Sequence, residues 1–341
     1  MKRRIGGASA GVLLCSAACL AALTPATASA ASFYEGKRIT LIVGFKPGGT
    51  ADADGRLIAK HLGTHIPGNP NFVVQNLPGA GGITATNLAY NVARPDGLSI
   101  YQLASGHYLQ QLAGSKVVKF DITKMPILGA WTRSQYVLAV RSDKFKSIEE
   151  MRNAKEPPRI ASSGTGTGTH LFTIAWQKAL GLKFKVVTGY GSAEQSLAVE
   201  RGEADGRTNS AKSIVNSNPH WITKNFAPPL VQGGPERDLL IPNVPTVREL
   251  NPNPGAFFEA VSEGLSVARP YALSPGTPAD RLEILRQAWG KMLKDEAFLA
   301  DVKKRKWDFV PTPYDKLESF YRKVLKDTPP EVIAELKEIF P

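Results

Sequence analysis

Cysteine is nearly absent from this chain of 341 residues: Cys15 and Cys19 are its only two cysteines. A disulfide scaffold and a zinc site built on cysteine are therefore excluded. Charged residues make up only 21% of the sequence, whereas hydrophobic residues make up 43%. This composition excludes disordered and collagen-like chains and is typical of a globular protein, for which the length predicts about two domains.

Long hydrophobic runs are also missing after residue 30. Before it, Lys2, Arg3 and Arg4 precede an apolar stretch over residues 11–23, and residues 28–30 read Ala-Ser-Ala. This order predicts a secretory signal peptide over residues 1–30. A transmembrane anchor would need about 20 apolar residues, more than this stretch offers. A lipoprotein signal ending at Cys19 is the alternative, although Ser16 stands where such signals prefer an aliphatic residue.

Cleavage after residue 30 would remove both cysteines, three basic residues and no acidic residue. The remaining 39 basic and 30 acidic residues carry a net charge of +9. Such an excess favours anionic partners, which include nucleic acids, membranes and small anions. Because there is no long run of Lys and Arg, and because the chain is expected to be exported, nucleic acid is not an expected partner. We expect a protein of the periplasm that is not embedded in the membrane.

Strand and helix patterns alternate along the rest of the chain. Residues 38–43 (RITLIV) are β-branched and apolar, as in a buried strand, and a glycine-rich turn and a helical pattern follow them. The same succession recurs around residues 71–89, and a second set of about a hundred residues begins near Met125. Alternation of this kind predicts an α/β fold with mainly parallel sheets, here in two lobes.

Glycine turns stand at Gly48, Gly79, Gly164 and Gly191, each after a predicted strand. In open α/β sheets, ligands bind beyond the carboxyl ends of the strands. Glycine lets the backbone approach a ligand closely, and the N-terminus of a helix attracts anions. The spacing of these glycines matches neither a dinucleotide fingerprint nor a phosphate-binding P-loop. The hydroxyls around Gly164 fit a carboxylate, which accepts several short hydrogen bonds.

Constellations that would indicate catalysis or metal binding are weak. His61 and His65 have the spacing of metal ligands, but no third ligand is nearby, and we interpret them as a solvated helix face. His107 and His170 lie beside the predicted cleft without an adjacent nucleophile, and no pair of acid and base is apparent. We therefore expect no catalytic residue, no metal and no cofactor.

Several motifs together resemble one known family. Residues 45–52 read FKPGGTAD and are followed by Arg56, which resembles the signature FPAGGxxDxxAR. Residues 76–82 read NLPGAGG, which resembles NxPGAGG, and Pro95-Asp96-Gly97 follows. Further matches are residues 163–171 (SGTGTGTHL), 244–246 (VPT) and 275–278 (PGTP). By these motifs the chain resembles the Bug family, the solute-binding receptors of tripartite tricarboxylate transporters.

The resemblance implies a two-lobed periplasmic-binding-protein fold of type II, in which each lobe is a mostly parallel sheet flanked by helices. Lobe 1 is expected to comprise residues 31–125 and 236–341, and lobe 2 residues 126–235. A monomer that closes on a small carboxylate between its lobes is implied. The partners would be the membrane subunits of a tripartite transporter.

The resemblance also implies the ligand contacts. In the family, two glycine turns of lobe 1 hold one carboxylate, partly through ordered waters, and lobe 2 holds the rest of the ligand. Carried over to this sequence, the contacts on lobe 1 are Phe45, Pro47, Gly48, Gly49, Asp52, Pro78, Gly79, Ala80 and Gly81. Those on lobe 2 are Ser163, Thr165, Gly166, Thr167, His170, Gly191, Ser192, Thr208 and Asn209.

The sequence departs from the family at Lys46, where proline is usual, and at Asp54, where an apolar residue is usual. Lys46, Arg133 and Arg207 could each meet a second carboxylate, which leaves the ligand open among di-, tri- and aromatic carboxylates. The resulting expectation is an extracytoplasmic receptor that delivers a carboxylate to a permease. The alternatives are an exported enzyme acting on a carboxylate and the sensing subunit of a signalling system.

Overall fold

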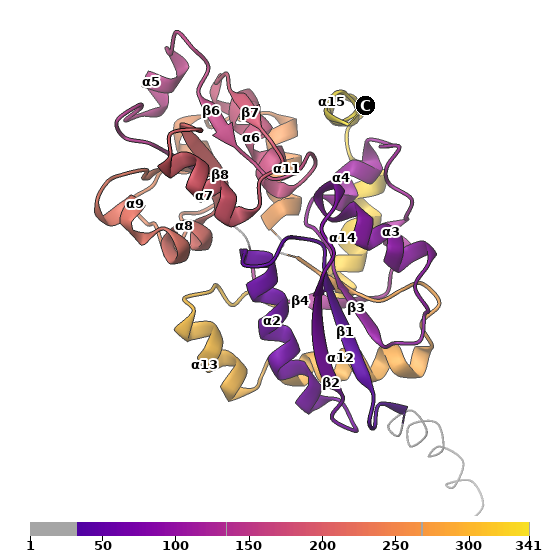
Figure 1. Cartoon of the computed structure of the whole chain (residues 1–341). Helices are drawn as coiled ribbons and strands as arrows, with labels where there is room; N and C mark the ends of the chain where they lie inside the picture. The colour runs from indigo at the N-terminus through magenta and orange to yellow at the C-terminus, as the bar shows by residue number, and fades with distance from the viewer. Residues whose placement is uncertain (1–32, 134, 267–268, 341) are drawn as a thin grey trace, which may run out of the picture.

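The structure is a computed structural model that describes residues 33–133, 135–266 and 269–340 (Figure 1). The predicted signal peptide, residues 1–30, lies outside these ranges. Within them, no helix has the length and apolar character needed to cross a membrane. Two groups of strands and helices face one another, one drawn mainly in indigo and yellow and the other in pink and red.

The first lobe is built on a six-stranded sheet in the order β11-β4-β10-β3-β1-β2. Strand β1, which lies next to the edge strand β2, carries the apolar, β-branched sequence predicted above, and its last three residues are buried. The strands are β1 (Arg38–Val43), β2 (Asn71–Asn76), β3 (Ser99–Gln102), β4 (Ile127–Ala130), β10 (Tyr271–Ala272) and β11 (Thr312–Pro313). The helices associated with this sheet are α2 (Thr50–Leu62), α3 (Ile83–Asn91), α4 (His107–Leu112), α12 (Ala279–Met292), α13 (Glu296–Lys304) and α14 (Tyr314–Asp327).

The second lobe is built on a five-stranded sheet in the order β7-β6-β8-β5-β9. Its strands are β5 (Tyr136–Val140), β6 (Arg159–Ala161), β7 (Lys185–Val187), β8 (Gly206–Ser210) and β9 (Pro229–Gln232). The helices between them are α5 (Ile148–Arg152), α6 (Gly168–Leu180), α7 (Ser192–Glu200), α8 (Ala211–Ser217) and α9 (Pro219–Thr223). The sheet is largely hidden, because every residue of β5 and β8 is buried.

The α/β class and the two lobes confirm the prediction, and in each sheet most strands run the same way while a few run against them. In the first sheet, β1 runs parallel to β2 and β3, whereas β10 pairs antiparallel with both β3 and β4. In the second, β6 is parallel to its neighbours and β5 is antiparallel to its own. β5 and β10 follow the segments where the chain passes between lobes, whereas β11, which is antiparallel to β4, follows α13.

The passages between the sheets lie later in the chain than expected. β4 belongs to the first sheet although the predicted second lobe begins at residue 126. After β9, Thr246 bridges to Gln232, and Asn251 donates to the carbonyl of Ala179 at 2.8 Å. Two further helices, α10 (Val247–Leu250) and α11 (Ala256–Ser266), pack against α6. We therefore propose that the second lobe extends from about residue 131 to about residue 266, in place of 126–235.

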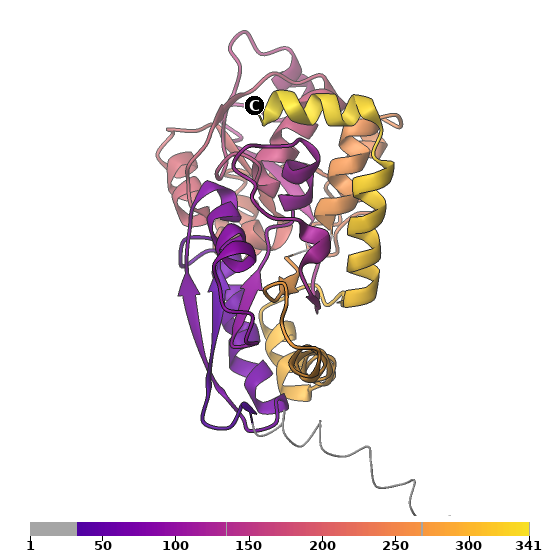
Figure 2. The same ribbon diagram turned by 90° about the vertical axis from the view of Figure 1, so that its right-hand side faces the viewer.

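Helix α11 ties the two lobes together. On one side it packs against α6 of the second lobe, and on another it contacts the C-terminal helix α15 (Pro330–Ile339), which also contacts α4 (Figure 2). Tyr108 on α4 donates from its hydroxyl to the carbonyl of Ala260 on α11 at 3.2 Å. An added Cβ at Gly264 would lie 1.5 Å from that hydroxyl oxygen. The approach of α11 to α4 therefore depends on glycine at position 264.

We expect Gly264→Ala to lower the free energy of unfolding by about 1–3 kcal/mol, because the added methyl group forces α11 away from Tyr108. The matched control is Gly290→Ala in α12, where nothing lies within 4 Å of the added Cβ. That substitution should stabilise the helix by about 0.5–1 kcal/mol, since alanine has the higher helix propensity. Urea unfolding of both variants measures the difference. Equal stability of the two variants would show that α11 does not pack as described.

Candidate ligand-binding site

The first element of the site is the turn between β1 and α2. Gly48 has φ +81°, in the left-handed region that favours glycine, and its N–H donates to Oδ2 of Asp52 at 3.0 Å. Asp52 also accepts from Arg56 and from Asn76 on the neighbouring strand. Burial raises the pKa of Asp52, but these hydrogen bonds outweigh it and hold the pKa below its usual value. Asp52 thus fixes the shape of the turn.

The second element is the turn between β2 and α3. Gly79, Ala80, Gly81 and Gly82 all have positive φ, and α3 begins without a side-chain cap at Gly82. His107 packs beneath this turn: an added Cβ on Gly82 would lie 3.2 Å from its Nε2, and its Nδ1 is 3.1 Å from Oγ1 of Thr86. His107 is fully buried, and burial lowers its pKa to about 4. A neutral imidazole therefore supports the turn.

The third element is the turn between β6 and α6 in the second lobe. Thr167 caps α6 by accepting from the backbone N–H of His170, and its hydroxyl donates to the carbonyl of Gly164. The hydroxyl of Thr169 accepts from the backbone N–H of Ser163 at 3.0 Å. These hydroxyls hold the turn in place, which leaves the hydroxyl of Ser163 beside the cleft, where Gln195 donates to it at 2.8 Å.

The fourth element joins the start of α7 to the end of β8. Asn209 donates to Oε1 of Gln195 at 3.0 Å and lies 3.4 Å from the hydroxyl of Ser192. Behind them Arg207 is fully buried and donates to the carbonyl of Ser192 and to the hydroxyls of Ser196 and Ser213. Burial lowers the pKa of Arg207 to about 9. This guanidinium therefore positions α7 and is not available to a ligand.

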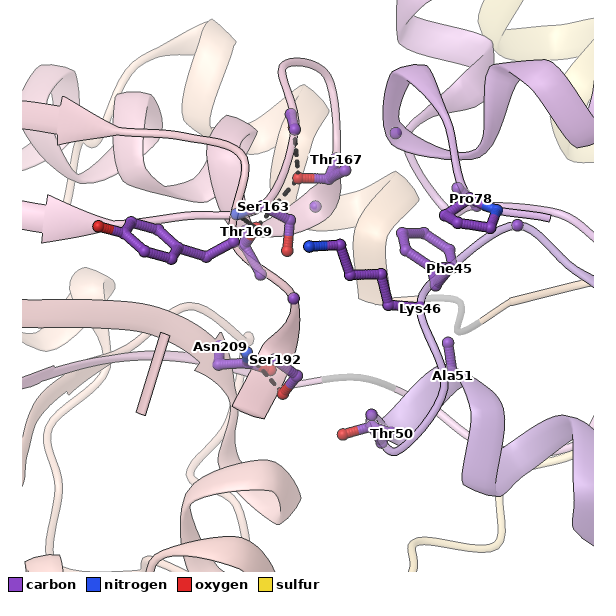
Figure 3. A pocket seen from close by; sticks show the side chains of 18 of the residues that line it. Phe45, Lys46, Thr50, Ala51, Pro78, Ser163, Thr167, Thr169, Ser192 and Asn209 are labelled. Atoms are coloured by element: carbon purple, nitrogen blue, oxygen red, sulfur yellow. Dashed lines mark hydrogen bonds between the residues drawn. The ribbon is translucent and has the colours of Figure 1, made fainter. Parts of the chain in front are cut away.

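The four turns enclose a cavity of about 410 Å³ between the lobes. Figure 3 shows Phe45 and Pro78 on one side, facing Ser163, Thr167 and Thr169 on the other. The facing backbones almost touch: an added Cβ on Gly81 would lie 3.0 Å from the carbonyl oxygen of Thr165. The described lining residues include no Asp, Glu, His or Cys.

Eleven of the eighteen predicted contacts line this cavity. They come from all four turns, in agreement with the prediction that a ligand binds beyond the carboxyl ends of the strands. These residues are Phe45, Gly49, Pro78, Gly79, Ala80, Gly81, Ser163, Thr167, Gly191, Ser192 and Asn209. Their contact with a ligand is a proposal taken up below.

The other seven predicted contacts do not line this cavity. Three of them are held by hydrogen bonds inside the protein, and the other four lie at turn tips or against other parts of the chain. Asp52 and His170 hold turns from inside, and Thr208 is buried and accepts from Thr173 and Trp176. Pro47 and Thr165 are exposed at the tips of their turns, Gly166 packs against Gln110, and Gly48 lines a neighbouring cavity beside α8 and the end of α13.

The sequence interpretation missed several lining residues. Ala104 and Ser105 follow the end of β3. The rule that ligands bind beyond the carboxyl ends of strands could therefore have predicted them. Tyr136 begins β5, and Thr50 and Ala51 begin α2 beside the first turn. Arg269 reaches the cavity from a segment far along the chain that carries no motif.

The three cations considered for a second carboxylate have other partners. Nζ of Lys46 lies 2.9 Å from each carboxylate oxygen of Glu194 across the mouth of the cavity. Arg133 lies 3.9 Å from Asp308 and does not line the cavity, and Arg207 is enclosed as described above. Arg269 lines the cavity, and its Nη1 is buried without a hydrogen-bond partner. Within the described ranges, no group of three or more His, Cys, Asp and Glu side chains is placed to hold a metal ion.

Comparison with known proteins gives consistent results. The family described as tripartite tricarboxylate transporter family receptor matches residues 56–322. A protein of Cupriavidus necator, the UPF0065 protein in the gbd 5' region, is 29% identical over 264 residues, which are 73% of this chain and 75% of that protein.

The fold is shared with proteins of solved structure. The periplasmic binding protein BugD aligns with a TM-score of 0.74 at 19% identity, over 90% of this chain and 98% of BugD. MatC from Rhodopseudomonas palustris, solved with bound malate, aligns with a TM-score of 0.71 at 19% identity, over 89% of this chain and 99% of MatC. Rpa4515 of R. palustris, solved with adipate, aligns with a TM-score of 0.70 at 20% identity, over 89% and 96% of the two chains.

The Lys46–Glu194 ion pair joins the lobes at the mouth of the cavity, and we expect it to slow their opening. Both side chains are about half exposed, at 49% and 48%, so the pair contributes at most about 1 kcal/mol. Glu194→Gln keeps an acceptor for the N–H of Gly191 but removes the charge. It should raise the dissociation rate of a bound ligand by up to about fivefold in stopped-flow measurements. Glu203→Gln breaks an exposed ion pair with Arg201 inside the second lobe that includes no cavity residue, and should leave the rate unchanged.

His107 should make stability depend on pH. Its pKa is about 4 in the folded protein and 6.5 in the unfolded chain, so only the unfolded chain binds the proton between these values. The free energy of unfolding should therefore fall as the pH drops from 6.5 to 4, by up to about 3 kcal/mol from this residue. His107→Gln should flatten that slope in urea titrations, whereas the same change at the more exposed His220 should keep it. A His107→Gln slope equal to that of the unaltered protein would contradict the assignment.

Proposed function

This chain belongs to the tripartite tricarboxylate transporter receptor family, and from that premise we propose that it captures a small carboxylate outside the cytoplasm. It would then deliver this ligand to the membrane subunits of a tripartite transporter. Members of the family are receptors rather than enzymes. The alternative that this chain is an exported enzyme acting on a carboxylate is therefore not supported. Location in the periplasm, cleavage after residue 30 and a monomeric state are parts of the same proposal.

The observation that carries the proposal is the chemistry of the cavity wall. Backbone segments with positive φ bring Gly79, Ala80 and Gly81 to the cleft, and the lining includes cations but no described acidic side chain. Unpaired N–H groups at helix starts favour an anion, and charge-assisted hydrogen bonds are stronger than neutral ones. Malate in MatC and adipate in Rpa4515 are carboxylates held on the same fold, which supports the choice.

Binding would proceed by closure of the lobes. The turns after β1 and β2 provide one half of the wall and the turns before α6 and α7 the other, so a ligand completes its contacts only when both halves meet it. A ligand that contacts both lobes stabilises the closed arrangement by the difference in its affinity for the closed and open states. The eleven lining residues named above are the contacts that we propose.

A thermal-shift screen of mono-, di- and tricarboxylates, aromatic ones included, identifies the ligand. A compound at 100 times its dissociation constant stabilises the folded protein by about 2.7 kcal/mol, which is a readily measured shift. Prolonged incubation with the tightest compound should return it unchanged, since no turnover is expected. Recovery of a chemically altered compound would contradict the receptor assignment.

The carboxylate itself should dominate the affinity. Methyl esterification of the best ligand removes its charge and one acceptor oxygen. Loss of two charged hydrogen bonds costs about 3 kcal/mol or more, which is over a hundredfold in affinity. Calorimetry on the acid and its methyl ester measures this ratio. An ester that binds within about tenfold of the acid would show that the glycine turns do not recognise an anion.

A further inference from the structure

We propose that Arg269 determines the charge that a ligand must carry: its guanidinium binds a second anionic group, so the receptor selects dianions over monoanions. This inference rests on the proposed function, because it assumes that the glycine turns hold a first carboxylate. None of the motifs in the sequence includes Arg269, which lies in the segment that leads from the second lobe back to β10.

Arg269 stands at the same edge of the first sheet as the glycine turns. β10 runs antiparallel to β3, and the N–H of Leu103 donates to the carbonyl of Pro270 at 2.8 Å, so the start of β10 lies beside the carboxyl end of β3. The strand order β10-β3-β1-β2 places three strand spacings between Arg269 and the turn over residues 78–82. Three spacings amount to about 14 Å. The two anionic groups of a ligand should therefore be several atoms apart.

Arg269 contributes to the cavity wall, and its guanidinium is incompletely hydrogen-bonded. It lines the cavity, lies 5.9 Å from the ring centroid of Phe45, and leaves Nη1 buried with no hydrogen-bond partner. Among the described residues it forms no ion pair. A buried donor without a partner carries a desolvation cost that an incoming acceptor can remove. An anionic group of the ligand, placed beside Phe45, would pair with the positive charge of this guanidinium.

Asp54 on α2 is an acidic residue that interacts electrostatically with Arg269. Its Oδ1 already accepts from Nε1 of Trp131 at 2.6 Å and from the hydroxyl of Tyr271 at 2.9 Å. Asp54 is fully buried, and burial raises its pKa despite the opposing charges of Arg269 and Lys212. Since it does not line the cavity, it balances part of the charge of Arg269 without taking the place of a ligand.

Lys46, the other cation of the cavity wall, is less suited to bind a second anionic group of the ligand. Lys46 is held by both carboxylate oxygens of Glu194, so its charge is already matched. Among the described lining residues, Arg269 is thus the cation without an ion pair. A ligand with a single carboxylate would satisfy the glycine turns and leave Arg269 unpaired, whereas a dianion would satisfy both.

The test compares each α,ω-dicarboxylate from succinate to pimelate with its monomethyl ester, by calorimetry, on the unaltered protein and on Arg269→Gln. Within each pair the chain length is constant and one charge is removed. We expect the unaltered protein to bind the best diacid at least about tenfold more tightly than its half-ester, as for one charged hydrogen bond. In Arg269→Gln the diacid should bind no more than about threefold more tightly than the half-ester.

Two variants serve as controls. Arg133→Gln removes a cation from the other passage between the lobes without touching the cavity wall, and should keep the full preference for the dianion. Arg269→Lys keeps a positive charge and should retain part of the preference for the dianion. This variant can still be measured if Arg269→Gln does not fold because Asp54 loses its countercharge. Equal preference in Arg269→Gln and the unaltered protein would overturn the inference.

The outcomes separate the inference from the proposed function. If monocarboxylates or half-esters bind the unaltered protein as tightly as every dicarboxylate in the series, the role of Arg269 is wrong and the carboxylate receptor stands. If Arg269→Gln is unfolded, Arg269→Lys decides: a preference for the dianion weaker than that of the unaltered protein supports the proposal, and an equal preference overturns it. If no carboxylate in the series or the wider screen binds the unaltered protein, both the proposed function and the inference are wrong.

Discussion

The close approach of backbone to backbone between the two lobes is the constraint on which the site depends. An added Cβ on Gly106 would lie 2.5 Å from the carbonyl oxygen of Gly166, and one on Gly164 would lie 3.3 Å from the backbone nitrogen of Gly81. Side chains at these positions would hold the sheets apart and widen the cavity. Because glycine stands there, the main chain itself forms the wall, and the shape of the cavity follows from the turns rather than from flexible side chains.

Much of the site was predictable because its parts are local. A buried strand, a glycine turn and a helix start form one continuous segment, so residues 38–52 and 71–83 indicated both the fold and the edge where a ligand lies. The family resemblance then named Phe45, Gly79 and Ser163, and all three line the cavity. Which side chain of a turn faces the cleft was less predictable. Thr167 faces it while also capping α6, but His170, three residues later, points into the turn.

The charged residues show the limit of reading a sequence alone. Lys46, Arg133 and Arg207 were equally plausible partners for a ligand, since a sequence does not say whether a cation already has a partner. In the structure Arg207 is enclosed by hydroxyls and a carbonyl, and burial lowers its pKa to about 9. Arg269 could not be predicted from the sequence, because its position depends on where the chain returns from the second lobe to the first. It also depends on the pairing of the two-residue strand β10 with β3 and β4, which are distant in sequence.

That short strand has a consequence for how the protein is assembled during synthesis. β10, residues 271–272, separates β3 from β4 in the first sheet, although β3 and β4 are made about 170 and about 140 residues earlier. Until β10 emerges from the ribosome, the facing edges of β3 and β4 have no strand between them, and unpaired edges are sites for aggregation. The second lobe, whose strands lie between residues 136 and 232, has all its partners much sooner. The lobe that begins first is therefore the lobe that is completed last, and a nascent chain of this protein has to be kept from premature pairing until nearly its whole length is available.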